Sequence, residues 1–287
     1  MQNSPIEIME NGIFEKSPDI EIKNDISKMF DTNRYGIIEL IIIKSLYKYE
    51  YLSINDLKKI LSHKLKPSLQ KPKYTTNINL LLREGHIAKA IYKTEKETGI
   101  TIYFLSETTY LFIRQKYKNK QVTYDGNITL DKPCDVLEKI AINQFHIDVL
   151  VTKAEKIKKE TYCSKRLLFK RRMYFPSNIE IKLDKGTCQL IAIPYGKKES
   201  IKELVSQLEK IDEIAVSQHI CKMYPIIICS SIESIKEAYK RLDMCVETPP
   251  QTMFVLERDC AIGNVLSKLI TIEKEGNVII MERCELI

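Results

Sequence analysis

The sequence predicts an α+β protein in two parts. Before residue 85, apolar residues recur at helical spacing in three segments, and two β-rich runs follow them. After residue 133, a long amphipathic helix precedes short apolar runs with the period of two that strands show. The length of 287 residues accommodates two domains of ordinary size. We therefore expect a small helical domain with a β-hairpin, followed by a mixed α/β domain.

Three helices are predicted in the first part. Residues 35–47 are compactly apolar. Ser53 is a favourable N-cap for a second helix over residues 54–61, because its hydroxyl can accept from a free backbone N–H. A third helix over residues 74–83 ends before Gly85, a residue that readily adopts the left-handed conformation that terminates helices.

A β-hairpin is predicted next, from strands 87–92 and 99–105 around the polar tip 93–98, and a helix over 107–118 follows it. Three helices and a hairpin of these lengths are typical of a winged helix-turn-helix, whose third helix enters the major groove of DNA. We predict such a domain over residues 34–118.

Positive charge concentrates in this predicted domain. Residues 58–96 hold ten lysines and arginines against two acids, a net charge of +8, whereas the whole chain carries +7. Such an excess neutralises phosphates, which favours double-stranded DNA as the partner. The alternative is a solvated basic face on a winged helix that binds protein.

The third helix supplies the candidate base contacts. Asparagine can bond adenine through two hydrogen bonds, and threonine or tyrosine can contact a thymine methyl group or a phosphate. The predicted base-contacting residues are Tyr74, Thr75, Thr76, Asn77 and Asn79. The predicted phosphate-contacting residues, all basic and in or beside the third helix and the hairpin, are Lys71, Lys73, Arg83, Lys93 and Lys96.

The N-terminal residues 1–33 are predicted to form an acidic arm. Through residue 31 they hold seven acids and three lysines, a net charge of −4. We expect the arm to be mobile or loosely packed, as chain termini often are. It is either an ordinary solvated tail or a competitor of DNA for the basic surface.

A polar linker is predicted at residues 119–132 and a mixed α/β domain at 133–287. Pro133 suits the first position of a helix that we expect to extend to about residue 159. A nearly apolar run at 224–229 indicates a buried, parallel strand. The other predicted elements are strands at 166–174, 179–183, 188–194 and 252–256, helices at 200–221 and 232–242, and a short helix with a terminal hairpin around Gly276.

Three local strings accompany this order of elements: Tyr103-Phe104-Leu105-Ser106, Phe175-Pro176-Ser177 and Tyr224-Pro225-Ile226-Ile227-Ile228-Cys229. In element order and in these strings, residues 34–257 resemble the replication-relaxation family of bacterial mobile elements. The resemblance implies a winged helix joined to a domain related to the restriction-endonuclease fold. The resulting hypothesis is a DNA-binding regulator of a plasmid, phage or integrated element, acting in replication control, transfer or transcription.

The residues for nuclease chemistry are incomplete in the second part. A nuclease of that fold needs an acid at the start of one strand and Glu-x-Lys on the next, because two carboxylates hold Mg²⁺. Ser177 takes the first position, and residues 190–195 contain no carboxylate. We therefore expect a degenerate, non-catalytic domain. The alternative is a metal-dependent nuclease that uses Glu180 and Lys182, with Asp148 as a second acid.

A second basic cluster lies at residues 153–172, with nine lysines and arginines against two acids, a net charge of +7. It is either a second phosphate-contacting surface or the protection of an edge strand together with a solvated helix end. The residues of this secondary basic patch are Lys165, Arg166, Lys170, Arg171 and Arg172.

The remaining features narrow the class of protein. Eight cysteines are widely spaced, without a C-x-x-C pair, which excludes the common zinc frameworks and favours reduced thiols in a cytoplasmic protein. The chain has no glycine-rich phosphate loop or dinucleotide motif, so we expect no cofactor and no enzymatic activity. No apolar run reaches 18 residues, which argues against a membrane-spanning helix. Apolar stripes on the helices at 107–118 and 133–159 favour a homodimer.

Overall fold

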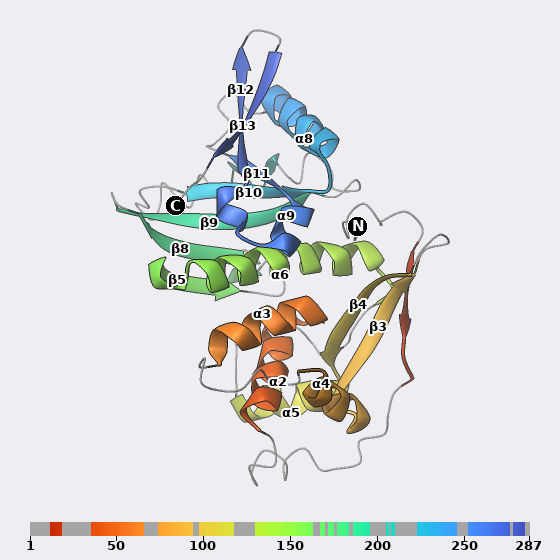
Figure 1. Cartoon of the computed structure of the whole chain (residues 1–287). Coiled ribbons are helices and arrows are strands. Elements are labelled where there is room, and N and C mark those ends of the chain that lie inside the picture. The colour runs from red at the N-terminus through yellow and green to blue at the C-terminus, as the bar shows by residue number, and fades with distance from the viewer. Residues whose placement is uncertain are drawn as a thin grey trace. The chain divides into compact units, whose positions relative to one another are not determined.

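The computed structural model describes a mixed α and β protein (Figure 1). Its described residues form two compact units, one up to residue 140 and one from residue 141 onward. The described ranges are 12–18, 36–65, 74–93, 98–117, 130–162, 167–169, 172–174, 177–183, 186–195, 205–206, 208–209, 223–245, 252–275 and 278–284.

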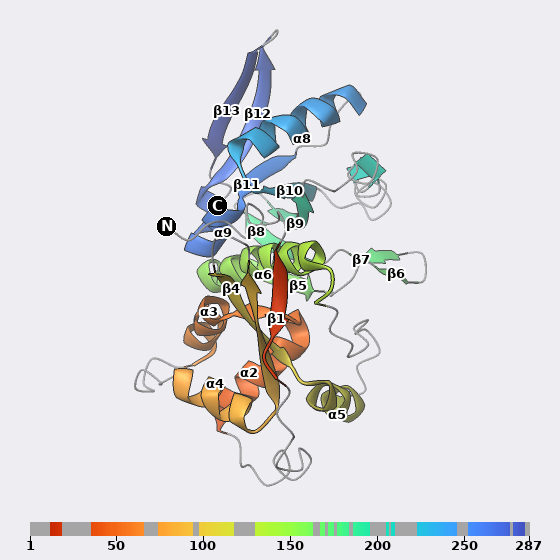
Figure 2. The same ribbon diagram turned by 90° about the vertical axis from the view of Figure 1, so that its right-hand side faces the viewer.

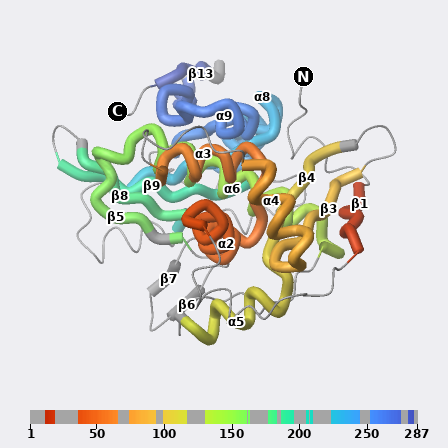
Figure 3. The backbone as a smooth tube through the Cα atoms, turned by 60° about the horizontal axis from the view of Figure 1, so that its bottom comes forward, coloured from red at the N-terminus to blue at the C-terminus, as the bar shows by residue number. Residues whose placement is uncertain are grey.

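Local signals in the sequence set the ends of the helices in the first unit. The Ser53 hydroxyl accepts from the Asp56 amide at 3.2 Å, while the Asp56 carboxylate accepts from the Ser53 amide at 3.0 Å, so a capping box starts the second helix. Gly85 has a φ of 76° and ends the third helix, as predicted. The helices are α2 (Ile37–Tyr49), α3 (Ile54–Lys64), α4 (Tyr74–Arg83) and α5 (Glu107–Tyr117), and Figure 3 shows α2, α3 and α4 side by side.

The sheet of this unit contains the predicted hairpin and two strands that were not predicted. Its order is β1 (Ile13–Lys16), β3 (Ile87–Lys93), β4 (Thr98–Leu105) and β2 (Leu52–Ser53), with every pairing antiparallel. The expectation of a loosely packed N-terminal arm is therefore wrong for residues 13–16, which pair with residues 93–90 along the edge of β3 (Figure 2). A four-residue strand carries too little pattern to be recognised without its partner.

The core of the first unit includes residues beyond the predicted linker. Val136, Leu137 and Ile140 of α6 (Pro133–Thr152) pack against the inner face of the β3–β4 hairpin, where Tyr92 and Phe104 are buried. The first unit therefore extends into the first half of α6. Residues 118–129, which hold most of the predicted linker, lie outside the described residues.

The second unit is built on a seven-stranded sheet in the order β13-β12-β11-β10-β9-β8-β5. β10 pairs in parallel with β9 and β11, and all its residues but the first are buried, which confirms the prediction of a buried parallel strand. The strands are β5 (Ile157–Tyr162), β8 (Ser177–Leu183), β9 (Gly186–Tyr195), β10 (Met223–Cys229), β11 (Met253–Leu256), β12 (Leu269–Glu275) and β13 (Val278–Cys284).

Two elements differ from their predicted lengths. α6 ends at Thr152, seven residues earlier than expected, and η1 (Ala154–Lys156) leads into β5. The lysine-rich segment suits a helix by propensity, but its pairing with β8 outweighs that preference. The single strand expected over residues 166–174 is instead a separate hairpin of β6 (Leu167–Phe169) and β7 (Arg172–Tyr174).

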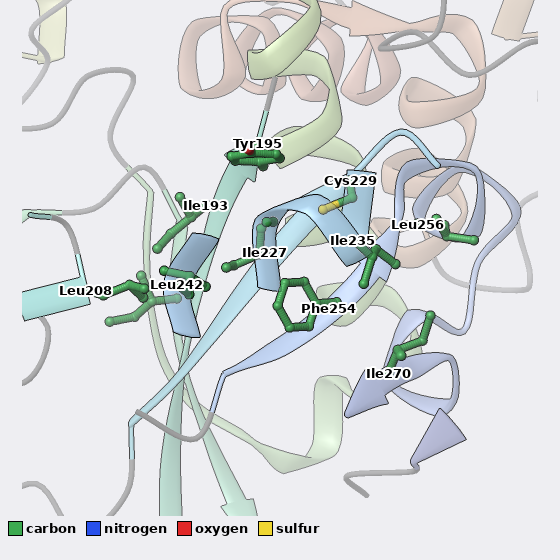
Figure 4. Packing of buried hydrophobic residues seen from close by; sticks show 12 residues of the cluster. Ile193, Tyr195, Leu208, Ile227, Cys229, Ile235, Leu242, Phe254, Leu256 and Ile270 are labelled. Atoms are coloured by element: carbon green, nitrogen blue, oxygen red, sulfur yellow. The ribbon is translucent and has the colours of Figure 1, made fainter. Parts of the chain in front are cut away.

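Helices cover both faces of this sheet. On one face, α8 (Ile232–Cys245) packs through Ile235 and Leu242 against Ile193, Ile227 and Phe254, as Figure 4 shows. On the other face, the second half of α6 lies over β8. α9 (Glu257–Ile262) and η2 (Val265–Ser267) follow β11. Most of the helix predicted at residues 200–221 lies outside the described residues, although 205–206 and 208–209 are helical.

Candidate nucleic-acid interface

α4 has one buried face and one exposed polar face. Ile78 and Leu81 are fully buried and hold the helix against the rest of the first unit. The opposite side is exposed, as expected for an amphipathic helix. It carries Thr75, Thr76, Asn79 and Arg83, which we call the α4 outer face.

Two further predicted base-contacting residues, Tyr74 and Asn77, lie at the flanks of α4. Tyr74 is half-buried, and its hydroxyl lies 3.5 Å from the Ser62 hydroxyl of α3. Asn77 is also half-buried, and its side-chain amide donates a hydrogen bond to the carboxylate of Glu39 on α2. One N–H of this amide is therefore engaged with the protein, and the bond turns the half-buried side chain toward α2, away from the exposed side of α4 where a base edge would be contacted.

The β3–β4 hairpin, which we call the wing, has a core face and a solvent face. Ala90 and Tyr92 point into the core, so the alternate residues Lys89 and Lys93 share the other face of β3. Tyr103 on β4 lies directly opposite Lys89 and belongs to the same face. Lys89 and Tyr103 were missed in the sequence, although counting in steps of two from Lys93 identifies Lys89.

One side chain on this face is a neutral hydrogen-bond donor. The phenol of Tyr103 is protonated at neutral pH, as tyrosines ordinarily are, and can donate a hydrogen bond to an acceptor such as a phosphate oxygen; desolvation raises its pKa further. Lys93, by contrast, forms an ion pair with Glu15 of β1. Of the predicted phosphate contacts, Lys71, Lys73 and Lys96 lie outside the described residues.

The secondary basic patch is described only in part. Lys165, Arg166, Lys170 and Arg171 lie outside the described residues, and Arg172 begins β7. Lys158 and Lys159, from the same basic segment of the sequence, are exposed on β5, an edge strand of the seven-stranded sheet. Charged side chains at such an edge discourage pairing with another chain, so these two lysines suit edge protection as well as phosphate binding.

The residues of the nuclease alternative are dispersed. Glu180 of β8 is half-buried between Lys159 of β5 and Gln189 of β9, and Lys182 is exposed on the same strand face. The Asp148 carboxylate is buried and accepts from the backbone N–H of Val265 at 2.7 Å, which fixes the start of η2. Within the described part of the chain, no three His, Cys, Asp or Glu residues are grouped so that they could hold a metal ion.

One polar cluster in the second unit was missed because its members are distant in sequence. His146 of α6 lies with Nδ1 2.8 Å from the Ser177 hydroxyl and with Nε2 3.0 Å from the Glu160 carboxylate. The Tyr162 hydroxyl donates to Asn143 beside it. Ser177 is fully buried, so it cannot meet a substrate, and the cluster instead joins α6 to β5 and β8.

No protein-family model matches this chain, and neither a curated protein nor a solved structure matches it. Among the helices that the structure describes, none is long and apolar enough to cross a membrane. Two polar surfaces of the first unit are described above, the α4 outer face and the solvent face of the wing.

Proposed function

We propose that the first unit is a winged helix-turn-helix that binds double-stranded DNA through α4 and the wing. The α4 outer face carries this proposal, because it turns polar and basic side chains away from the core along one side of a helix. A helix in this place in the order of elements is the one that enters the major groove. The net charge of +8 over residues 58–96 supports a polyanionic partner.

The side chains of the α4 outer face suit distinct roles. Asn79 lies on the exposed side of α4, and its side-chain amide can form two hydrogen bonds with adenine. Thr75 and Thr76 can contact thymine methyl groups or phosphates. Arg83 at the end of the helix, with Lys89 and Lys93 of the wing, can neutralise backbone phosphates. Asn77 instead serves to hold α4 against α2 through Glu39.

For the second unit we propose a non-catalytic role. Its buried Ser177 replaces the carboxylate that a restriction-endonuclease-like site needs at this strand start, and Asp148 is occupied as a helix cap. Together with the resemblance to replication-relaxation proteins, this supports a DNA-binding regulator of a plasmid, phage or integrated element. Replication control, transfer and transcription are the processes in which such a regulator would act.

We further propose that the protein acts as a homodimer. One winged helix reads a short site, and two-fold symmetry doubles the length of DNA that is read. The exposed side chain of Leu111 on α5, 45% accessible, supports an apolar contact there. Light scattering at tens of micromolar protein tests this proposal. A strict monomer with a single, unrepeated footprint would contradict it.

The direct test of DNA binding is a salt series. Genomic or plasmid fragments retained by the protein are sequenced, and fluorescence anisotropy then gives the affinity for the selected duplex. If α4 and the wing make about five phosphate contacts, log K falls against log salt with a slope near −4 to −5. A slope near zero, or no duplex binding at about 50 mM salt, would refute the proposal.

A further inference from the structure

β1 places a carboxylate on the same face of the wing as its lysines. In the antiparallel pairing of β1 with β3, Ile13 lies opposite Lys93 and Glu15 lies opposite Ile91. Residues that face each other in this way point to the same side of the sheet. Glu15 therefore shares the solvent face with Lys89 and Lys93, and its carboxylate forms an ion pair with the Lys93 ammonium.

Specific contacts hold β1 in this register. The ring of Phe14 packs on that of Tyr92 with centroids 5.0 Å apart, and the Ser17 amide donates to the Lys89 carbonyl at 3.0 Å. Gly12 passes so close to the fully buried Tyr92 that a Cβ at this position would lie 2.1 Å from the Tyr92 ring. The position of Glu15 beside Lys93 is thus determined by packing and by the backbone.

The attachment of β1 is nevertheless weak enough to be reversed. β1 has four residues, is the edge strand of its sheet, and buries part of only one large side chain, Phe14. Ile13 remains 61% exposed. Short edge elements with few buried contacts open at low free-energy cost. The ion pair is equally open to competition, since the Glu15 and Lys93 side chains are 52% and 44% exposed.

We infer that β1 is an autoinhibitory strand, whose Glu15 competes with DNA phosphates for Lys93. This inference rests on the proposed function of the wing. Because Glu15 is tethered to the surface that it neutralises, it competes at a high effective concentration. DNA that binds the wing must displace Glu15. This cost affects non-specific DNA most, because its affinity comes from phosphate contacts.

The test removes the carboxylate without disturbing the strand. Glu15→Gln keeps the size and exposure of the side chain, and at about 50 mM salt it is expected to tighten duplex binding about two- to fivefold, the range of an exposed ion pair. The gain shrinks as salt rises, because screening weakens the competing ion pair. In a Lys93→Gln background, the Glu15→Gln substitution no longer changes affinity, since its target is gone.

A matched control separates this contact from a change in net charge. Glu237 of α8 is an exposed acid in the second unit, so Glu237→Gln alters the net charge equally and is expected to leave affinity unchanged. Tightening by Glu237→Gln equal to that by Glu15→Gln would overturn the inference. The inference would also be overturned if Glu15→Gln bound duplex DNA with wild-type affinity while Lys93→Gln bound it more weakly. That outcome would leave the proposed function intact. If wild type and every variant fail to bind duplex DNA, the proposed function and the inference fall together.

Discussion

Asn77 of α4 donates its side-chain amide to Glu39 of α2, 38 residues earlier in the chain. Glu39 is only 6% exposed, so this bond supplies a donor to a carboxylate that water barely reaches. The contact joins the proposed recognition helix to the first helix of the unit. It makes Asn77 a determinant of how α4 is held, in contrast to its exposed neighbours.

Asn77→Ala is therefore expected to destabilise the protein by about 1–3 kcal/mol, because it leaves the buried carboxylate of Glu39 without this donor. Urea unfolding followed by circular dichroism measures the change. Asn79→Ala, on the exposed face of the same helix, is the matched control and should alter stability by no more than about 0.5 kcal/mol. Equal losses in the two variants would contradict the structural role of Asn77.

Asn79 and Lys93 should differ in how they affect DNA binding. Asn79→Ala is expected to weaken binding to the selected site by about 1–3 kcal/mol and binding to random duplex very little, because only the selected site offers the paired base edge. Lys93→Ala should weaken both by the same factor and flatten the salt slope by about one. Anisotropy titrations of both variants with the selected site and with random duplex measure these affinities. If both variants lost affinity for the two duplexes in the same proportion, the roles of Asn79 and Lys93 would be misassigned.

His86 at the start of β3 should make stability depend on pH. It is fully buried, and desolvation lowers its pKa below the ordinary value of about 6.5, although the charge of Glu84 opposes the shift. As pH falls through about 6.5, the unfolded chain takes up a proton that folded His86 does not. Stability is thus full above that pH and falls below it, by up to about 1.4 kcal/mol per pH unit.

Urea unfolding at a series of pH values between about 7.5 and 5 measures this loss. His86→Gln should lose less stability over the range than wild type. Asn79, an exposed and non-titrating residue of the same unit, provides the control, and Asn79→Ala should retain the full pH dependence. An identical profile for wild type and His86→Gln would exclude His86 as the cause.

We expect no cleavage or nicking of supercoiled plasmid with Mg²⁺ or Mn²⁺. Of the two carboxylates in the nuclease alternative, Asp148 is buried and only the half-buried Glu180 is accessible. Mg²⁺ needs an octahedral oxygen shell anchored by carboxylates and substrate phosphate. Agarose gels of plasmid incubated with wild type, Glu180→Gln and Lys182→Ala provide the measurement. Cleavage by wild type that both substitutions abolish would establish the nuclease alternative, and cleavage that survives both would indicate a contaminant or another site.

The sequence predicted those features of the fold whose causes are local. The Ser53 cap, the Gly85 terminator and the apolar run of β10 each act within a few residues, and their elements lie where expected. β1 and β5 were missed because their stability comes from pairing with strands far along the chain. Four residues carry too little pattern to reveal the first strand, and the lysine-rich sequence of the second favoured a helix.

The same division applies to the candidate site. Helical periodicity from Ile78 and Leu81 is sufficient to place Thr76 and Asn79 on an exposed face of α4. The engagement of Asn77 could not be predicted, because Glu39 lies within an apolar helix and nothing in its neighbourhood points to α4. His146 and Ser177 likewise meet only once α6 packs on β8.

α6 has a practical consequence for work with fragments of the protein. A fragment that stops in the predicted linker loses Val136, Leu137 and Ile140, and the apolar side chains of Tyr92 and Phe104 that they cover become exposed to water. Such a fragment would be prone to aggregation during expression. Extension through Ile140, where the first unit ends, restores this cover and also the ion pair of Lys139 with buried Glu50. The following residues of α6, among them Phe145 and Val149, are buried in the second unit, so a fragment that ran to the end of α6 would expose a different apolar face. The fragment of the first unit with the least exposed apolar surface therefore ends near Ile140.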